Sequence, residues 1–219
     1  MLRLALAVAF SGCGRIGFDA AAKAGTTDAG PDNPDGASAR CDRTQPFGAP
    51  VRLSALSSAS AEIGLELTDD QLDGFLWSDR TGADTLYETR RASTADAFGA
   101  PDLLPALAGF APAGFAASVG VSPDRDPCPS GDGLSVVFGS LRPGAGDWDL
   151  WMATRTTRTA PFAPPVALTS LNTANANWGA YLTSSGLGLY YVEGTDLRVA
   201  YRASTTTTTF SAPTVLQSS

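Results

Sequence analysis

The sequence predicts an all-β protein built from repeated sheets, and three observations carry that prediction. The chain of 219 residues contains 23 glycines and 15 prolines, which interrupt helices and suit short strands joined by many turns. Only 17% of the residues are charged, and serine and threonine supply most of the remaining polar side chains. One phrase also occurs three times, as DTLYETRRAS at 84–93, WDLWMATRTT at 148–157 and TDLRVAYRAS at 195–204. Recurrence of this kind is typical of repeat architectures.

A second phrase follows each copy of the first and begins with phenylalanine. It reads FGAPDLL from Phe98, FAPPVAL from Phe162 and FSAPTVL from Phe210, while FGAPVRL from Phe47 stands before the first copy. Successive phenylalanines are 51, 64 and 48 residues apart. A period of this length fits one propeller blade of four short strands. We therefore expect an incomplete β-propeller-like array of about three blades over residues 47–219.

The apolar patterning places strands within each period. In the first period we expect strands at 50–53, 62–68, 74–78 and 85–90, with turns at DDQLDG and DRTGAD. The third period repeats this order with strands at 178–183 and 187–193 and then DLRVAYR. In the second period we expect the first hairpin to be enlarged to SPDRDPCPSGDG, an insertion that carries Cys128 and lengthens the spacing.

The number of repeats leaves the closure of the fold open. Closed propellers have typically four to eight blades, and three periods with one extra opening strand fall short of that number. The array is then an open arc, a shortened relative of a longer propeller, or part of a ring that other copies complete. The alternative fold is a jelly-roll type β-sandwich, which about a dozen antiparallel strands can also form.

Several short motifs recur at matching places in the periods. The second period is the fullest, with Ser122-Pro123-Asp124, Ser140, Arg142 and Asp149-Leu150-Trp151; the first keeps Asp70, Ser78-Asp79-Arg80 and Leu86-Tyr87, and the third keeps Asp196-Leu197. These motifs resemble the PD40, or WD40-like, β-propeller repeats of TolB-type proteins. The resemblance implies a propeller fold, whereas function stays open because propellers serve in binding, scaffolding and many enzymes.

The N-terminus, MLRLALAVAFSGC, resembles a bacterial lipoprotein signal over residues 1–13. Arg3 supplies a positive charge, an apolar stretch follows at 4–10, and the small residues Ser11 and Gly12 stand before Cys13. The resemblance implies that Cys13 is lipidated and becomes the mature N-terminus; an ordinary cleaved signal is the alternative. Both interpretations export the protein, and we expect a lipid-anchored protein at the outer membrane of a Gram-negative bacterium, on its periplasmic side or beyond.

Residues 14–46 consist largely of alanine, glycine, aspartate, proline and threonine. Such a segment buries too little apolar surface to fold, and we expect a flexible, low-complexity linker between the membrane and the repeats. Export places Cys41 and Cys128 in an oxidising compartment, where they could form a disulfide. Two separate thiols are the alternative.

The charge and the residue inventory exclude several functions. The net charge of -7 disfavours nucleic acid as a partner. Because the chain has no histidine, it lacks the commonest general base, the commonest zinc ligand and any Ser-His-Asp arrangement. We expect no catalytic residues, no cofactor and no metal ion. The remaining route to catalysis is a pair of carboxylates, for which the candidates are Asp69, Asp70, Asp124, Asp126, Asp132, Asp147 and Asp149.

Most of these aspartates stand in predicted turns, where their hydrogen bonds to the local backbone explain them. A calcium loop formed by Asp124, Asp126 and Asp132 has the right ligand chemistry, but the spacing fits no calcium motif. Four tryptophans could form an aromatic platform: Trp77, Trp148, Trp151 and Trp178. Trp151 shares its repeat position with Tyr87, which indicates a packing role. We therefore take Trp148 and Asp147, with Asp124 and Asp126, as the candidate ligand surface.

These observations predict an exported, membrane-anchored lipoprotein that serves as a non-catalytic binding or scaffolding module. Its partners would be the lipid bilayer, through the acyl anchor, and a protein or glycan ligand, with self-association as a way to complete a ring. The alternatives are a carbohydrate-active, glycosidase-like enzyme that uses aspartates, and a truncated, inactive propeller.

Overall fold

The computed structural model describes residues 49–107, 123–142 and 147–217, and within these ranges every regular element is a β-strand. The predicted lipoprotein signal and the linker, and with them Cys13 and Cys41, lie outside the described residues. We find no helix in the described ranges whose length and apolar character would let it cross a bilayer.

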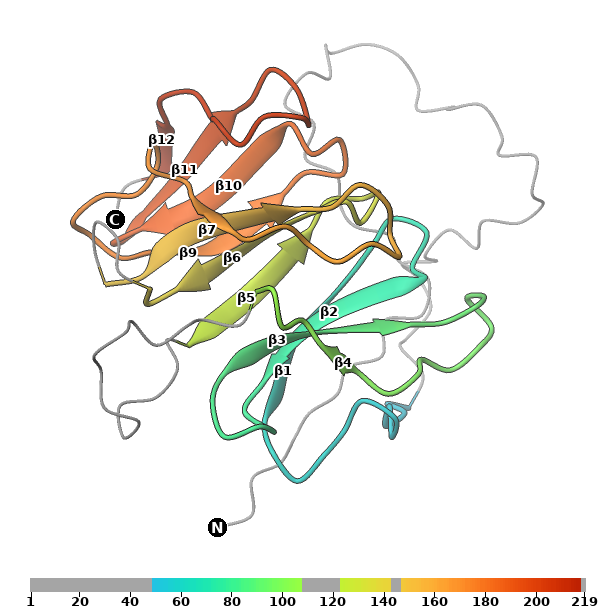
Figure 1. Cartoon of the computed structure of the whole chain (residues 1–219). Helices are drawn as coiled ribbons and strands as arrows, with labels where there is room; N and C mark the ends of the chain where they lie inside the picture. Colours follow the sequence, from blue (N-terminus) through green and yellow to red (C-terminus); the bar gives the residue numbers. More distant parts are fainter. Residues whose placement is uncertain (1–48, 108–122, 143–146, 218–219) are drawn as a thin grey trace.

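Twelve strands form three antiparallel sheets of four strands each, and every sheet uses four consecutive strands (Figure 1). The first sheet contains β1 (Glu62–Leu67), β2 (Asp73–Ser78), β3 (Thr85–Arg90) and β4 (Asp102–Leu103). The second contains β5 (Asp124–Pro129), β6 (Ser135–Ser140), β7 (Asp149–Thr154) and β8 (Val166–Ala167). The third contains β9 (Asn177–Leu182), β10 (Gly188–Glu193), β11 (Asp196–Tyr201) and β12 (Thr214–Gln217).

The three sheets are stacked in the order in which they occur along the chain. Strand β5 packs against β1, β2 and β3, and β9 packs in the same way against β5, β6 and β7. Among the described elements, no strand of the first sheet contacts a strand of the third. This succession of similar sheets is an incomplete propeller-like fold, as the sequence predicts. The jelly-roll alternative is wrong, because it would require distant strands to interleave within one sheet.

We call the face of a sheet that points along the stack from the first sheet toward the third its forward face, and the opposite face its rear face. Of the three described sheets, the second packs against a sheet on both faces. Alternate residues of β6 serve both cores: Val136 and Phe138 pack toward the first sheet, and Val137 packs toward the third. Because both faces are covered, this strand is a continuous apolar run with no polar alternation. A large apolar side chain buried this completely contributes roughly 1.5–3 kcal/mol.

The sequence-based placement of the opening strand is wrong. Residues 50–53 form no strand and lead into a turn at 54–56. Each phenylalanine phrase instead closes the sheet before it: β4 follows Phe98, β8 follows Phe162 and β12 follows Phe210. The residues before this copy of the phrase lie outside the described ranges.

The predicted insertion in the second period is also wrong. Residues 124–129 form β5, and the turn that follows has the same length as its counterparts in the other sheets. Pro127 and Pro129 indicate a loop in the sequence, but β5 is an edge strand of its sheet, and an edge strand tolerates residues without an N–H. The extra length of this period lies at 108–122, outside the described residues. Cys128 is therefore a strand residue and is only 2% exposed.

Candidate functional site

The arginine that closes each repeat phrase has the same structural role three times. Its Nε donates to a carbonyl in the first turn of its own sheet, and its guanidinium lies over the phenylalanine that follows. These contacts are Arg91 to Gln71 O (2.8 Å) and Phe98 (4.5 Å), Arg155 to Gly133 O (2.8 Å) and Phe162 (4.4 Å), and Arg202 to Gly186 O (2.6 Å) and Phe210 (5.5 Å). This shared structural role is sufficient to explain why the phrase recurs.

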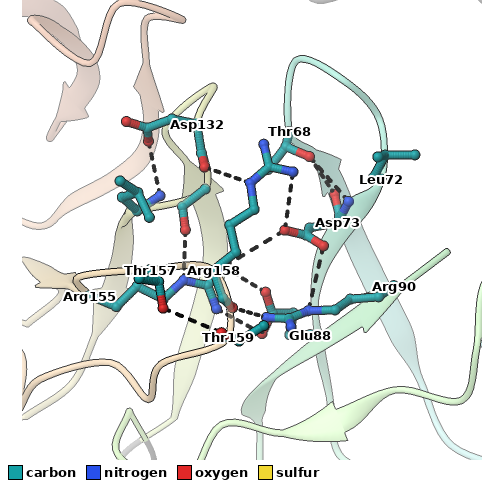
Figure 2. A network of polar contacts seen from close by, with 12 residues as sticks. Thr68, Leu72, Asp73, Glu88, Arg90, Asp132, Arg155, Thr157, Arg158 and Thr159 are labelled. Carbon is teal, nitrogen blue, oxygen red and sulfur yellow. Dashed lines mark hydrogen bonds and ion pairs between the residues drawn. The ribbon is translucent and has the colours of Figure 1, made fainter. Parts of the chain in front are cut away.

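Arg155 additionally joins the second sheet to the first (Figure 2). Its guanidinium forms two hydrogen bonds to the Glu88 carboxylate, at 3.0 and 2.8 Å, and its side chain is only 1% exposed. Such bidentate pairs are among the strongest polar contacts in proteins. Arg90 also contacts Glu88, at 3.0 Å, and lies 3.5 Å from Asp73. These residues form the charged joint between the first two sheets.

Arg158 extends the charged joint to the surface, where it lies 2.6 Å from Asp70 and 3.7 Å from Asp73. Burial would raise the pKa of Asp70, but hydrogen bonds from Arg158, Leu72 N–H and Thr68 outweigh it and lower that pKa. Burial raises the pKa of Asp73, and the negative charge of Glu88 raises it further. The neighbouring arginines act to lower this pKa but do not cancel the effect of burial. The carboxylates of the charged joint thus form ion pairs that connect the first two sheets.

The equivalent joint between the second and third sheets lacks the carboxylates, because Ser135 and Met152 occupy the positions of Asp73 and Glu88. Arg202 stands where Arg155 stands, but Met152 replaces Glu88, and its sulfur lies 3.6 Å from Arg202 Nη1. Arg202 Nη2 is buried and has no hydrogen-bond partner among the described residues. Burial accordingly lowers the pKa of Arg202.

A second cluster lies where the first and second sheets meet at the start of β5. It comprises Trp77, Asp84, Arg125, Asp126 and Trp148, and we call it the Arg125 cluster. The guanidinium of Arg125 lies 4.9 Å from the ring of Trp77 and 5.3 Å from that of Trp148. Arg125 also donates from Nε to Asp84 at 2.7 Å, and its side chain remains 42% exposed. The cluster therefore offers a fixed cation and the half-buried ring of Trp148 to solvent, whereas Trp77 is only 8% exposed and supports Arg125 from the core.

Asp126 departs from the repeat because it stands where the other two sheets have glycine. The third residue of the first strand in each sheet (β1, β5 and β9) has a positive φ: 68° at Gly64, 52° at Asp126 and 61° at Gly179. A left-handed backbone is strained for a residue with a side chain, and such strain is concentrated at functional sites. Burial raises the pKa of Asp126, although Arg125 and Trp77 act to lower it. The Trp77 N–H makes no hydrogen bond of good geometry within the described residues.

The predicted ligand residues are only partly brought together. Asp126 and half-buried Trp148 lie in the Arg125 cluster. Exposed Asp147 precedes Trp148 in the chain. Asp124 is instead fully buried and lies 2.9 Å from Arg142, a structural ion pair. The sequence analysis did not identify Arg125 as a functional residue. The available signal was a charged residue at the second position of β5, where β1 and β9 have Ile63 and Trp178.

The four tryptophans do not form one platform. Trp77 and Trp148 share Arg125, whereas Trp151 lies beside Arg142, at 5.3 Å. The shared position of Trp151 and Tyr87 is confirmed, since Arg80 lies over Tyr87 at 4.8 Å in the first sheet. Trp178 is 46% exposed on β9 of the third sheet.

The calcium-loop alternative is wrong. Asp124 and Asp126 lie at the start of β5 and Asp132 beyond its end, about 15–20 Å away at the rise of a strand. Asp132 Oδ1 instead accepts hydrogen bonds from Leu134 N at 2.9 Å and Ser130 Oγ at 2.6 Å. Within the described ranges, no three His, Cys, Asp or Glu residues are grouped as metal ligands would be.

Cys128 is packed into the core between the second and third sheets, where its Sγ accepts a hydrogen bond from Leu182 N at 3.1 Å. Its predicted partner, Cys41, lies outside the described residues, so the disulfide stays a prediction.

Comparison with known proteins adds one structural likeness. No family model matches the sequence, and no curated protein matches it. Among solved structures, the chain is similar to TolB from Acinetobacter baumannii, with 17% sequence identity and a TM-score of 0.43. The match covers 70% of this chain and 32% of the TolB chain, so the chain spans about a third of that neighbour's length.

Proposed function

We propose that this protein is a non-catalytic binding module whose ligand surface is the Arg125 cluster. The observation that supports this is the exposed guanidinium of Arg125 between the rings of Trp77 and Trp148, beside an aspartate with a strained backbone. Packing alone does not require this arrangement, because glycine occupies the position of Asp126 in the other two sheets.

The chemistry of the cluster suits a glycan. Aromatic faces stack against sugar rings, while a guanidinium and nearby carboxylates exchange hydrogen bonds with hydroxyl groups. Trp148 is half-buried, and Asp147 beside it is exposed. Arg125 is already balanced by Asp84, so a neutral, hydroxyl-rich ligand fits better than an anionic one.

A titration of the full chain with neutral oligosaccharides, followed by tryptophan fluorescence, tests the proposal. We expect saturable binding that Trp148→Ala weakens by tenfold or more, since one indole stack is worth about 1.4 kcal/mol or more. The matched control is Trp178→Ala, which removes an exposed indole from the third sheet and should leave the affinity unchanged. Absence of binding at millimolar sugar, or equal loss in both variants, would contradict the proposal.

We also propose that the module is exported and held at the membrane by a lipid on Cys13, with residues 14–46 as the tether. The support is the N-terminal sequence alone. Radiolabelled palmitate should enter the wild-type chain and a Cys41→Ala control, and should be absent from Cys13→Ala. Label that survives in Cys13→Ala would defeat this part of the proposal.

A further inference from the structure

The forward face of the third sheet differs from the forward faces of the other two. Strand register places Tyr190, Val192, Leu197 and Tyr201 on this face. Tyr181, the β9 partner of Tyr190, joins them, with the two rings 6.4 Å apart. We call these five residues the terminal face.

The terminal face is exposed where its counterparts are buried. Leu86 in the first sheet and Leu150 in the second are each 0% exposed, because the next sheet covers them. Leu197 occupies the same register position in the third sheet and is 38% exposed. Tyr201 is 46% exposed. The surface that receives a neighbouring sheet twice within the chain is thus open at the third around Leu197 and Tyr201, whereas Val199 on the same face is only 4% exposed.

The side chains of the terminal face also lack the charges of its counterpart. The first sheet carries Asp73, Glu88 and Arg90 on its forward face, and these form the charged joint. The third sheet has Gly188, Val199 and Tyr201 at the same positions. A chain with a net charge of -7 repels its own copies, but this face adds no charge of its own. Tyrosine and leucine side chains are suited to a protein interface.

We infer that the terminal face binds the terminal face of a second copy of this chain, about a two-fold axis. In the internal interfaces a forward face packs on the rear face of the next sheet, and the proposed pairing likewise covers a forward face with a sheet, here an identical one. A head-to-tail stack would need the rear face of the first sheet, where Leu76 and Tyr87 are each only 2% exposed and therefore already covered. Two copies of an open, uncharged face can meet without rearrangement, and two-fold pairing of identical patches is the commonest form of self-association.

The dimer should be weak. From the rise and spacing of strands, a face of three six-residue strands and one four-residue strand measures at most roughly 20 Å by 14 Å. This is smaller than the interfaces of stable complexes. We therefore expect a dissociation constant in the micromolar range.

Sedimentation equilibrium of the full chain carrying Cys13→Ser, so that no lipid contributes, tests the inference. From low micromolar to near-millimolar protein, the mass should rise from one chain to two and stop there. Leu197→Glu and Tyr201→Glu should each raise the dissociation constant about tenfold or more, since each buries a charge at the contact. The matched control is Leu103→Glu, because Leu103 is 40% exposed on β4 of the first sheet and its replacement should leave dimerisation intact.

A single-chain mass at every concentration, or a mass that grows past two copies, would overturn the inference. A dimer that neither glutamate variant weakens would do the same. If a glutamate variant fails to fold, amide hydrogen exchange provides a second test on the Cys13→Ser chain, which carries no substitution in its β-strands. Raising the protein concentration should slow exchange at exposed positions of β10 and β11 and leave β2 and β3 unchanged; equal change in both pairs would count against the terminal face.

Discussion

Asp126 shows how a single residue can depart from an otherwise regular repeat. Its counterparts, Gly64 and Gly179, take the left-handed backbone at little cost, whereas Asp126 adds a partly buried carboxylate. Burial is the largest influence on this group and raises its pKa above 3.8. A folded state with a raised carboxyl pKa binds its proton more tightly than the unfolded state does. Ionised Asp126 therefore lowers the free energy of unfolding at neutral pH.

We predict that Asp126→Asn raises the free energy of unfolding at pH 7, because the buried carboxylate no longer has to ionise in the folded state. Asparagine keeps the shape and tolerates the left-handed backbone but carries no charge. Urea unfolding between pH 3 and pH 7 checks this: the wild type should lose stability relative to the variant as pH rises from about 3.8 through the raised pKa. A variant that loses stability in step with the wild type across this range would contradict the assignment.

The charged joint allows a second test with single residues. Glu88→Gln leaves the buried Arg155 without its bidentate carboxylate, and we predict a loss of about 3 kcal/mol in the free energy of unfolding. The control is Arg158→Gln, which breaks the pair with Asp70 at the surface, where the side chains are 31% and 41% exposed. That change should cost under about 1 kcal/mol. Urea denaturation at neutral pH distinguishes the two; equal losses would mean that the joint is not an energetic unit.

At the scale of elements, β7 provides a comparison between two buried neighbours on one face. Met152 and Leu150 are both 0% exposed, but only Met152 faces the guanidinium of Arg202. We predict that Met152→Glu changes the free energy of unfolding by about 1 kcal/mol or less, because it recreates the pairing of Glu88 with Arg155. Leu150→Glu buries a charge with no such arginine and should cost several kcal/mol. Thermal unfolding of both variants checks this, and a Met152→Glu chain as unstable as Leu150→Glu would contradict it.

The central strands were predictable from the sequence, and the edges of the sheets were not. Apolar runs at 74–78 and 85–90 mark β2 and β3 to within a residue, since patterning reflects burial. The phenylalanine phrase was placed one sheet too late, because a two-residue strand such as β4 carries no periodicity of its own. Prolines concealed β5, since their exclusion from strands applies to central strands and not to edges.

The candidate site was predictable only in part for a related reason. Asp126 and Trp148 are unusual within their own segments, and the sequence indicates both. Arg125 acquires its role from Asp84, 41 residues earlier, and from Trp77, which lies in a different sheet. No local pattern reports a pairing that exists only after two sheets have stacked.

At the scale of the whole molecule, stability should vary along the stack. The second sheet is packed on both faces, with Val136, Val137 and Phe138 each 0% exposed, whereas the terminal face of the third sheet is open. Since each sheet contacts only its neighbours, opening can be local, as in other repeat proteins.

We predict that amide exchange at low micromolar concentration is slowest in β6 and β7 and faster in β10 and β11. Exchange measured on the full chain by mass spectrometry checks this order, with β2 and β3 as internal references. Uniform protection across the three sheets would mean that the stack unfolds only as one unit.

The contact between Met152 and Arg202 also bears on oxidative damage. A sulfoxide usually disrupts a core because its oxygen is polar. Here the sulfur lies 3.6 Å from Arg202 Nη1, and Nη2 of the same guanidinium has no hydrogen-bond partner in the described part of the chain. An oxygen added to this sulfur would have a donor beside it, so peroxide treatment should lower the melting temperature of the wild type by less than that of an Arg202→Leu chain.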